Sequence, residues 1–297
     1  MSEMLRDYAR RIAGTRPPPG TIGIFWLGQA GFVLRGADTT LVVDAFLSSR
    51  PDRQADAPVA AEELDFADAF LATHEHRDHL DLPSWPTFAV AAPAARFIVP
   101  APLVARAAEV VPAARVIGAL PDAEIAIGGA RVLPVPARHG VHVADAYSFG
   151  LVPGEYRFLG YVIELEGIRV YHAGDTIRYE GMAERLRALA VDVALLPING
   201  RSPEREAQDL VGNLSASEAA DLAADAGIGT VIPMHYELFA RNSGRASELV
   251  EYVAGRHPEV AVVVLPRYDG IMLASPYSQR VSGSLRGQRS DPPGTTT

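Results

Sequence analysis

Short apolar runs separated by glycine and aspartate turns dominate the first part of the chain. Three such runs, at residues 21–28, 31–36 and 39–46, are typical of short strands connected in a meander. The apolar run from Ala69 to Thr73 predicts a buried strand that ends in a polar loop. Residues 89–111 mix apolar runs with alanine-rich segments and prolines, which predicts a strand, a helix and short connections.

The second half repeats the strand pattern and adds helices. Strands are predicted within 130–137, 158–167 and 168–176, and the turn Glu166-Gly167 indicates a hairpin. Helical spacing follows at 182–190, 215–227 and 247–255, with Ser215 as an N-cap facing Glu218 and strands at 191–197 and 229–235 in between. Two β-rich halves, each followed by helices, predict an α/β fold of two sheets packed face to face with helices outside.

Domain organisation follows from where this pattern stops. Residues 1–280 are predicted to form a single domain, because two-layered α/β folds of this length are commonly one unit. Residues 281–297 lack apolar periodicity, which predicts a disordered tail.

Composition limits the possible metal ligands and binding partners. The chain has no cysteine, so a metal must be bound by histidine or carboxylate. A net charge of -9 disfavours nucleic acid as a partner. No apolar run of membrane-spanning length and no secretion signal is found, which predicts a cytoplasmic protein without a membrane span. The sequence leaves the oligomeric state open, a homo-oligomer included.

The greatest concentration of possible metal ligands lies directly after the predicted strand at 69–73. Residues 74–79 read His-Glu-His-Arg-Asp-His. An extended backbone points His74 and His76 to one side, while Asp78 and His79 can turn toward a second point nearby. One loop can therefore serve two metal ions, each of which needs further ligands from elsewhere.

Three further candidates each follow an apolar strand. They are His139 after 132–138, Asp175 in the Gly-Asp turn, and His235 after 230–234. Strand ends hold side chains with the small positional tolerance that metal coordination demands. In the segment ARHGVH, His142 competes with His139; we prefer His139 because it directly follows the apolar strand.

The order HxHxDH, His, Gly-Asp, His resembles the metallo-β-lactamase superfamily. Within it, the chain is similar to the L-ascorbate-6-phosphate lactonase group through PPGTIGIFWLGQAGFVLR, ATHEHRDHLD, YHAGDT and VIPMHYELFARN, which lie between about residues 18 and 245. The resemblance implies a four-layer αββα sandwich with a metal site along one edge of the two sheets. It also implies two divalent ions, Mn²⁺ or Zn²⁺, with Fe²⁺ as a third option, and tilts toward Mn²⁺.

The resemblance also implies a role for each residue of the motifs. One ion would be bound by His74, His76 and His139, the other by Asp78, His79 and His235, and Asp175 would bridge them. Asp44 would lie behind the ligands and orient the HxHxDH loop through hydrogen bonds. Asp78 would additionally guide a proton.

Four residues near the ends of two strands are candidates for contacts with a small-molecule substrate. Asn199 and Arg201 follow the apolar run 193–197, and Arg201 could bind a phosphate or carboxylate with two hydrogen bonds. Tyr236 and Asn242 flank His235 and are candidates for the pocket wall.

We expect a metal-dependent hydrolase, in which hydroxide attacks the carbonyl of a lactone of a sugar-acid-like substrate. The first alternative is a phosphodiesterase that acts on a small or lipid phosphodiester, because two metal ions can also clamp the oxygens of that reaction. The second is a non-catalytic metal-binding protein of the same fold.

Overall fold

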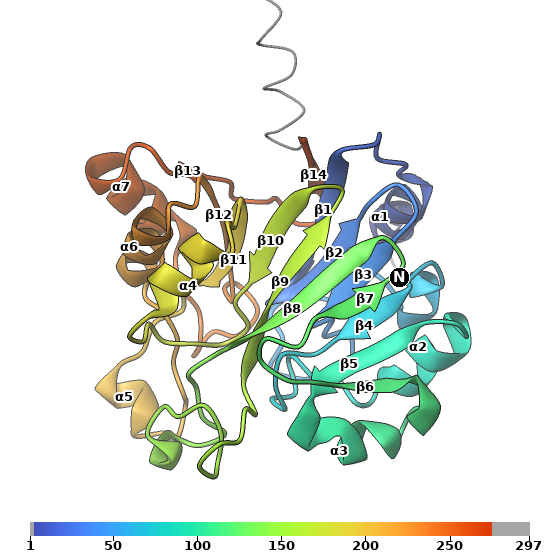
Figure 1. Cartoon of the computed structure of the whole chain (residues 1–297), viewed down its shortest axis with the longest axis horizontal. Coiled ribbons are helices and arrows are strands. Elements are labelled where there is room, and N and C mark those ends of the chain that lie inside the picture. The colour runs from blue at the N-terminus through green and yellow to red at the C-terminus, as the bar shows by residue number, and fades with distance from the viewer. Residues whose placement is uncertain (1–2, 275–297) are drawn as a thin grey trace, which may run out of the picture.

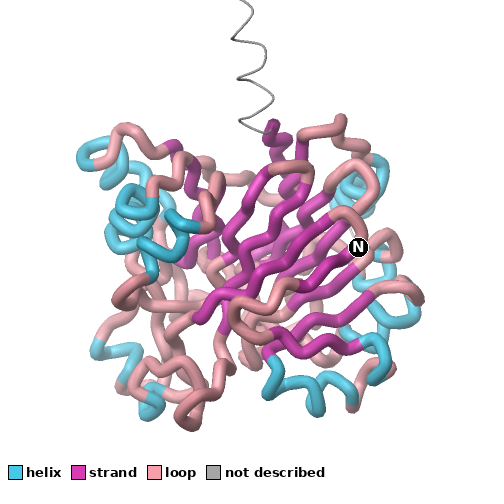
Figure 2. Tube along the Cα trace, in the orientation of Figure 1, coloured by secondary structure: helices cyan, strands magenta, loops and turns pink. Residues whose placement is uncertain are grey.

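The structure is a computed structural model that describes residues 3–274. Two seven-stranded sheets pack face to face, and helices cover the outer face of each (Figure 1). The tube in Figure 2 shows the strands gathered at the centre and the helices at the two flanks. This arrangement confirms the predicted αββα sandwich. The tail predicted at 281–297 lies outside the described residues, and the single domain over 1–280 stays a prediction.

The first sheet has the order β14-β1-β2-β3-β4-β5-β6. Its strands are β1 (Thr21–Gly28), β2 (Gly31–Arg35), β3 (Thr40–Val43), β4 (Ala69–Leu71), β5 (Arg96–Pro100), β6 (Val116–Ala119) and β14 (Gly270–Ala274). The pairs from β14 to β3 are antiparallel and those from β3 to β6 are parallel. The predicted meander is therefore confirmed, while β4 ends at Leu71, two residues earlier than expected.

The second sheet has the order β13-β12-β11-β10-β9-β8-β7. Its strands are β7 (Ile125–Ile127), β8 (Ala130–Pro136), β9 (Leu159–Leu165), β10 (Ile168–His172), β11 (Val193–Pro197), β12 (Thr230–Met234) and β13 (Ala261–Val262). Antiparallel pairing from β7 to β10 confirms the hairpin at Glu166-Gly167, and β10 to β13 are parallel.

Helices flank both sheets. On the first sheet lie α1 (Glu3–Gly14), α2 (Trp85–Ala91) and α3 (Val104–Ala108), and on the second α4 (Met182–Ala188), α6 (Ala216–Ala226) and α7 (Ala246–Arg256), with the short α5 (Pro203–Glu206) below them in Figure 1. Ser215 caps α6 in a capping box with Glu218, as predicted. The helix α1 was not predicted from the apolar pattern of the chain. No helix among residues 3–274 is long and apolar enough to cross a membrane.

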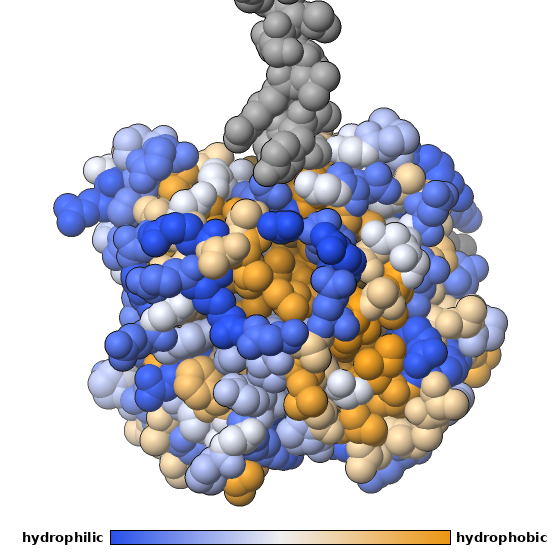
Figure 3. Space-filling model, in the orientation of Figure 1, coloured by the Kyte–Doolittle hydropathy of each residue, from blue (hydrophilic) through white to orange (hydrophobic). Residues whose placement is uncertain are grey.

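The alternation of side chains along the inner strands builds two cores. In β2, Phe32 and Leu34 pack between the sheets, whereas Val33 packs against the helices of the first sheet. In β4, Leu71 belongs to the inner core and Phe70 to the outer one. Strands buried on both faces read as continuous apolar runs, which explains the sequence pattern. Figure 3 shows apolar surface gathered over the strands, between flanks that are mainly polar.

Strand direction brings the polar strand ends to one edge. The strands β3 and β4 are parallel, as are β10, β11 and β12, so the loops at their carboxyl ends share an edge of their sheet. The strand β8 is antiparallel to β9, which is antiparallel to β10, so β8 runs in the same direction as β10. The residues that follow these strands are therefore placed close together by the topology.

We expect a glycine of this edge to tolerate no side chain. Gly174 has a φ of +60°, and an added Cβ would lie 2.7 Å from the Leu159 carbonyl oxygen and 2.8 Å from Thr73 Cβ. The Gly174→Ala variant should lose about 1 kcal/mol through backbone strain and a further ~1–3 kcal/mol through overpacking. Gly227→Ala, at φ +72° with nothing within 4 Å of the added Cβ, is the matched control and should show the strain alone. Urea unfolding measures both, and equal losses would contradict the packing argument.

Candidate metal centre

The histidines and aspartates predicted as ligands form two neighbouring groups. In each group, one potential ligand atom per residue lies within 4.8 Å of the others. The first group is His74, His76, His139 and Asp175, and the second is Asp78, His79 and His235. The chain thus brings the HxHxDH loop after β4 together with residues that follow β8, β10 and β12.

Three imidazoles of the first group face one another. His76 Nδ1 lies 2.9 Å from His74 Nε2 and 3.3 Å from His139 Nε2. His74 and His139 are buried, whereas His76 is partly exposed. The first group therefore extends from the buried interior to the solvent-accessible surface.

Asp175 lies between the two groups. Its Oδ1 is 3.3 Å from His79 Nε2, and its Oδ2 is 3.5 Å from His139 Nε2 and 3.3 Å from His235 Nε2. Asp78 Oδ2 completes the second group, at 3.4 Å from His235 Nε2 and 3.7 Å from His79 Nε2. One carboxylate thus presents an oxygen to each group, which is the geometry of a bridging ligand.

The spacing of these atoms fits metal ions. Ligand atoms about 2.0–2.2 Å from a tetrahedral ion stand roughly 3.3–3.6 Å apart, close to the separations of 3.3–3.5 Å around Asp175. Two buried atoms of the cluster, His79 Nε2 and Asp175 Oδ1, have no hydrogen-bond partner among the described residues. Buried polar atoms are rarely left unpaired, and a cation between them would satisfy both. The cluster is therefore able to bind metal.

Asp44 orients the cluster from behind. Its Oδ2 accepts the Nδ1–H of His79 at 2.6 Å, which leaves His79 Nε2 facing the cluster. The same carboxylate accepts hydrogen bonds from the Thr73 backbone N–H at 2.8 Å and from the Thr73 hydroxyl at 2.7 Å. Asp44 is fully buried and belongs to neither group. Its position matches the orienting role that the family resemblance implies.

Burial and neighbouring charges shift the pKa values in opposite directions. Desolvation lowers the pKa of His74 well below its ordinary value and that of His139 to about 3, which leaves both imidazoles neutral. Burial also opposes the charge of His235, but Asp175 and Asp78 outweigh it and raise its pKa to about 9. A divalent cation would replace the proton that His235 holds between these carboxylates.

The competing histidine of the ARHGVH segment lies outside the cluster. His142 is exposed, and its Nδ1 lies 2.6 Å from Asp209 Oδ2. His139, in contrast, is buried, and its ring stands beside those of His74 and His76, with centroids 5.1 Å apart in both cases. The geometry favours His139 as a ligand and leaves His142 at the surface.

A cleft of about 950 Å³ opens onto the cluster. Its lining includes His76, Asp78, Asp175 and His235. Asn242 also lines it, and the buried Asn199 donates a hydrogen bond from Nδ2 to Asn242 Oδ1 at 2.7 Å. Asn242 thus lines the cleft and Asn199 stands behind it, and substrate contact by these residues stays a prediction.

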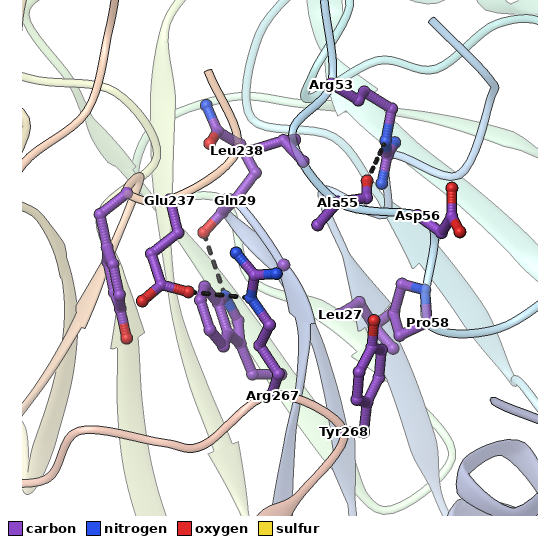
Figure 4. A pocket seen from close by; sticks show the side chains of 13 residues that line it. Leu27, Gln29, Arg53, Ala55, Asp56, Pro58, Glu237, Leu238, Arg267 and Tyr268 are labelled. Atoms are coloured by element: carbon purple, nitrogen blue, oxygen red, sulfur yellow. Dashed lines mark hydrogen bonds and ion pairs between the residues drawn. The ribbon is translucent and has the colours of Figure 1, made fainter. Parts of the chain in front are cut away.

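Two of the residues predicted to contact substrate lie elsewhere. Arg201 forms two hydrogen bonds with Glu218, at 2.6 and 2.8 Å, and does not line the cleft. Tyr236 stacks on Trp26 with ring centroids 4.9 Å apart, beside a separate small pocket. Figure 4 shows that pocket, between Arg267, Tyr268 and Pro58. Their placement corrects the sequence analysis, because neighbouring side chains engage both residues.

Gln29 is a residue of the site that the sequence analysis missed. Its Nε2 lies 2.8 Å from Asp78 Oδ2 and 3.1 Å from His235 Nε2, and its backbone oxygen accepts the N–H of His235 at 3.0 Å. Gln29, Asp44 and His235 all have positive φ, of 51°, 48° and 60°, a strain that often accompanies function. The signal in the sequence was a glutamine in the tight turn Gly28–Gly31 of an otherwise apolar hairpin.

Replacing the two competing histidines should separate their roles. His139→Ala removes an imidazole that faces the first group, so we expect it to bind one metal ion fewer than the unaltered protein. His142→Ala should retain the full metal content, because His142 contacts only Asp209 and its neighbours at the surface. Elemental analysis after gel filtration measures both, with circular dichroism as the control for folding. Metal loss in His142→Ala alone would reverse the assignment.

Removing the charge of Asp44 should weaken metal binding without removing a ligand. Asp44→Asn loses the carboxylate that accepts the Nδ1–H of His79, and second-sphere changes of this kind cost about 10–100-fold in metal affinity. Equilibrium dialysis against Zn²⁺ measures the affinity. Unchanged affinity in a folded variant would show that Asp44 supports only the loop.

Comparisons with known proteins agree with this geometry. The sequence profile of the Beta-lactamase superfamily domain matches residues 39–236. A UPF0173 metal-dependent hydrolase of Thermococcus onnurineus is 31% identical over 82% of this chain and 96% of its own length. Another, from Korarchaeum cryptofilum, is 29% identical over the same shares.

A solved structure shares the fold at lower sequence identity. Igni18, a metallo hydrolase from Ignicoccus hospitalis, superposes with a TM-score of 0.66 at 20% identity and covers 85% of this chain and 98% of its own. The profile match, the relatives and the clustered ligands lead to one conclusion: the chain is a metal-dependent hydrolase that belongs to the metallo-β-lactamase superfamily, among the UPF0173 hydrolases.

Proposed function

We propose that the chain is a lactonase that opens a lactone of a sugar-acid-like small molecule in the cleft above the metal centre. The resemblance to the L-ascorbate-6-phosphate lactonase group supports this choice. The observation that carries it is that, among the described residues, no carboxylate of the cleft outside the metal-binding groups is free to donate a proton. The reaction must therefore suit a leaving group that needs no separate acid from the protein.

The carboxylates that line the cleft are all engaged. Asp52 accepts two hydrogen bonds of 2.7 Å from Arg50, which hold its pKa below the ordinary value. A hydrogen bond with His142 likewise lowers the pKa of Asp209. Asp78 and Asp175 belong to the metal-binding groups. A lactone alkoxide can take its proton from water, whereas an amide nitrogen needs a proton before it departs, so esters are favoured over amides.

The metal-binding groups supply the remaining chemistry. We propose Mn²⁺ or Zn²⁺, with Fe²⁺ as a third option, held by the two groups described above. Bound ions of this kind lower the pKa of a water molecule toward about 7 and stabilise charge on a carbonyl oxygen. Asp78 retains 19% side-chain exposure at the cleft and is held by Gln29, so we assign proton acceptance to it.

The proposed partner is a small molecule, because a cleft of about 950 Å³ is within the size range of small-molecule sites and the net charge of -9 disfavours nucleic acid. We also propose a cytoplasmic location, with which the absence of cysteine agrees. The rival reaction is hydrolysis of a small or lipid phosphodiester. The arginines that line the cleft favour a negatively charged substrate. Phosphodiesters are therefore included among the substrates to be tested.

A substrate panel separates these reactions. We expect the metal-loaded protein to hydrolyse lactones and simple esters, to leave amides intact, and to lose activity on removal of metal by a chelator. His76→Ala should abolish turnover while the chain stays folded, and Arg96→Gln, on an exposed residue outside the cleft, is the control. Hydrolysis of lactones, esters and phosphodiesters releases acid, which a pH indicator follows, and chromatographic detection of the released amine measures hydrolysis of amides. Phosphodiester turnover without lactone turnover would reject the proposal.

A further inference from the structure

Two arginines that line the metal cleft form no ion pair with a carboxylate of the described residues. Arg77 and Arg241 both line it, and both are exposed. Among the side chains of residues 7–274, no carboxylate lies within the 4.0 Å of an ion pair from either guanidinium. The one hydrogen bond of the Arg241 side chain is a long one, of 3.5 Å, to Gln208 Oε1. Both charges are therefore available to a ligand.

The other charged groups of the cleft are neutralised or held by the protein. Arg50 and Asp52 form a two-pronged ion pair, and Asp209 pairs with His142. Arg53 donates to the backbone oxygens of Phe46, Ser48 and Ala55, the last of these bonds being drawn in Figure 4. Outside the metal-binding groups, the cleft thus carries an excess of positive charge on Arg77 and Arg241.

The backbone ties Arg77 to the metal-binding loop. It stands between His76 and Asp78, so its Cα lies about 3.8 Å from that of each neighbour. The loop is a tight turn, in which the N–H groups of His79 and Leu80 donate to the His76 carbonyl oxygen at 3.0 and 2.8 Å. Arg77 therefore lines the same cleft as the metal-binding residues on either side of it.

Arg241 approaches the cleft from the loop after β12. Phe239 and Ala240 precede it and also line the cleft, and the Phe239 ring lies 6.1 Å from that of Phe46. The cleft consequently combines a small apolar wall with two unpaired guanidinium groups. A ligand with a short carbon skeleton and a terminal anion matches this combination.

We propose that Arg77 and Arg241 form an anion subsite, which binds a carboxylate or phosphate group of the substrate while its reacting group lies at the metal centre. The proposal rests on the proposed function only for the identity of that reacting group. A single exposed arginine is commonly just solvated. Two arginines without an ion-pair partner line one cleft with a metal-binding cluster, where each can donate charge-assisted hydrogen bonds to an oxyanion.

Binding of two non-reacting acids tests the subsite. Butyrate has one carboxylate, which the metal centre can bind, and succinate has the same chain length with a carboxylate at each end. Isothermal titration calorimetry on the metal-loaded protein should show succinate binding about tenfold more tightly, the gain expected from one charge-assisted contact. A ratio near one in the unaltered protein would overturn the proposal.

Variants assign that gain to the two arginines. The double variant Arg77→Gln/Arg241→Gln should bind succinate and butyrate about equally, while its metal content and thermal midpoint stay unchanged. Arg96→Gln removes an exposed arginine outside the cleft, and it should keep the tenfold ratio. If the double variant also keeps the ratio, the second carboxylate binds elsewhere and the subsite is refuted.

A third acid shows whether the subsite prefers phosphate or carboxylate. The same titrations test the subsite independently of the proposed lactonase activity. With 3-phosphonopropionate, a loss of affinity in the double variant that exceeds the loss for succinate assigns the subsite to phosphate, and a smaller or equal loss assigns it to carboxylate. These titrations do not depend on turnover. A protein that hydrolyses no lactone yet shows the arginine-dependent contrast would retain the subsite and lose the lactonase proposal, and the opposite result would do the reverse.

Discussion

The structure depends on holding ionisable groups of both signs out of water at one edge of two sheets. Asp175, His235 and His79 are almost fully buried there. Taking such charges out of water is costly unless each is paired with a neighbour of opposite charge. Asp175 meets this demand from the centre, with one oxygen toward His79 and the other toward His139 and His235. A divalent cation is the partner that balances the whole set.

The sandwich supplies the rigidity that such an arrangement needs. Strands buried on both faces place their carboxyl ends at a common edge, and every ligand follows one of these ends within a few residues. The two sheets contribute to the same cluster, since the HxHxDH loop follows β4 and Asp175 follows β10. Packing between the sheets therefore fixes distances between ligands that no single sheet could set.

Candidate metal ligands that directly follow an apolar strand could be predicted from the sequence. His74, Asp175 and His235 each follow an apolar strand, and strand direction alone brings such positions together. The positions of Arg201 and Tyr236 could not be predicted in this way, because their side chains contact Glu218 and Trp26, which are distant in sequence. Gln29 escaped for the opposite reason, since a turn glutamine gains meaning only when the second sheet places His235 beside it.

Substrate choice must therefore come from elements other than the metal ligands. The cluster can activate water for several kinds of substrate, because nitrogen and oxygen ligands with bound cations impose no shape on the rest of the molecule. Shape and charge come instead from the loops that line the cleft, where Phe46 and Phe239 provide apolar surface and Arg77 and Arg241 provide charge. Arg77 lies in the same tight turn as His76 and Asp78. In the proposed subsite, recognition of the substrate anion and activation of water would therefore depend on one short segment of backbone.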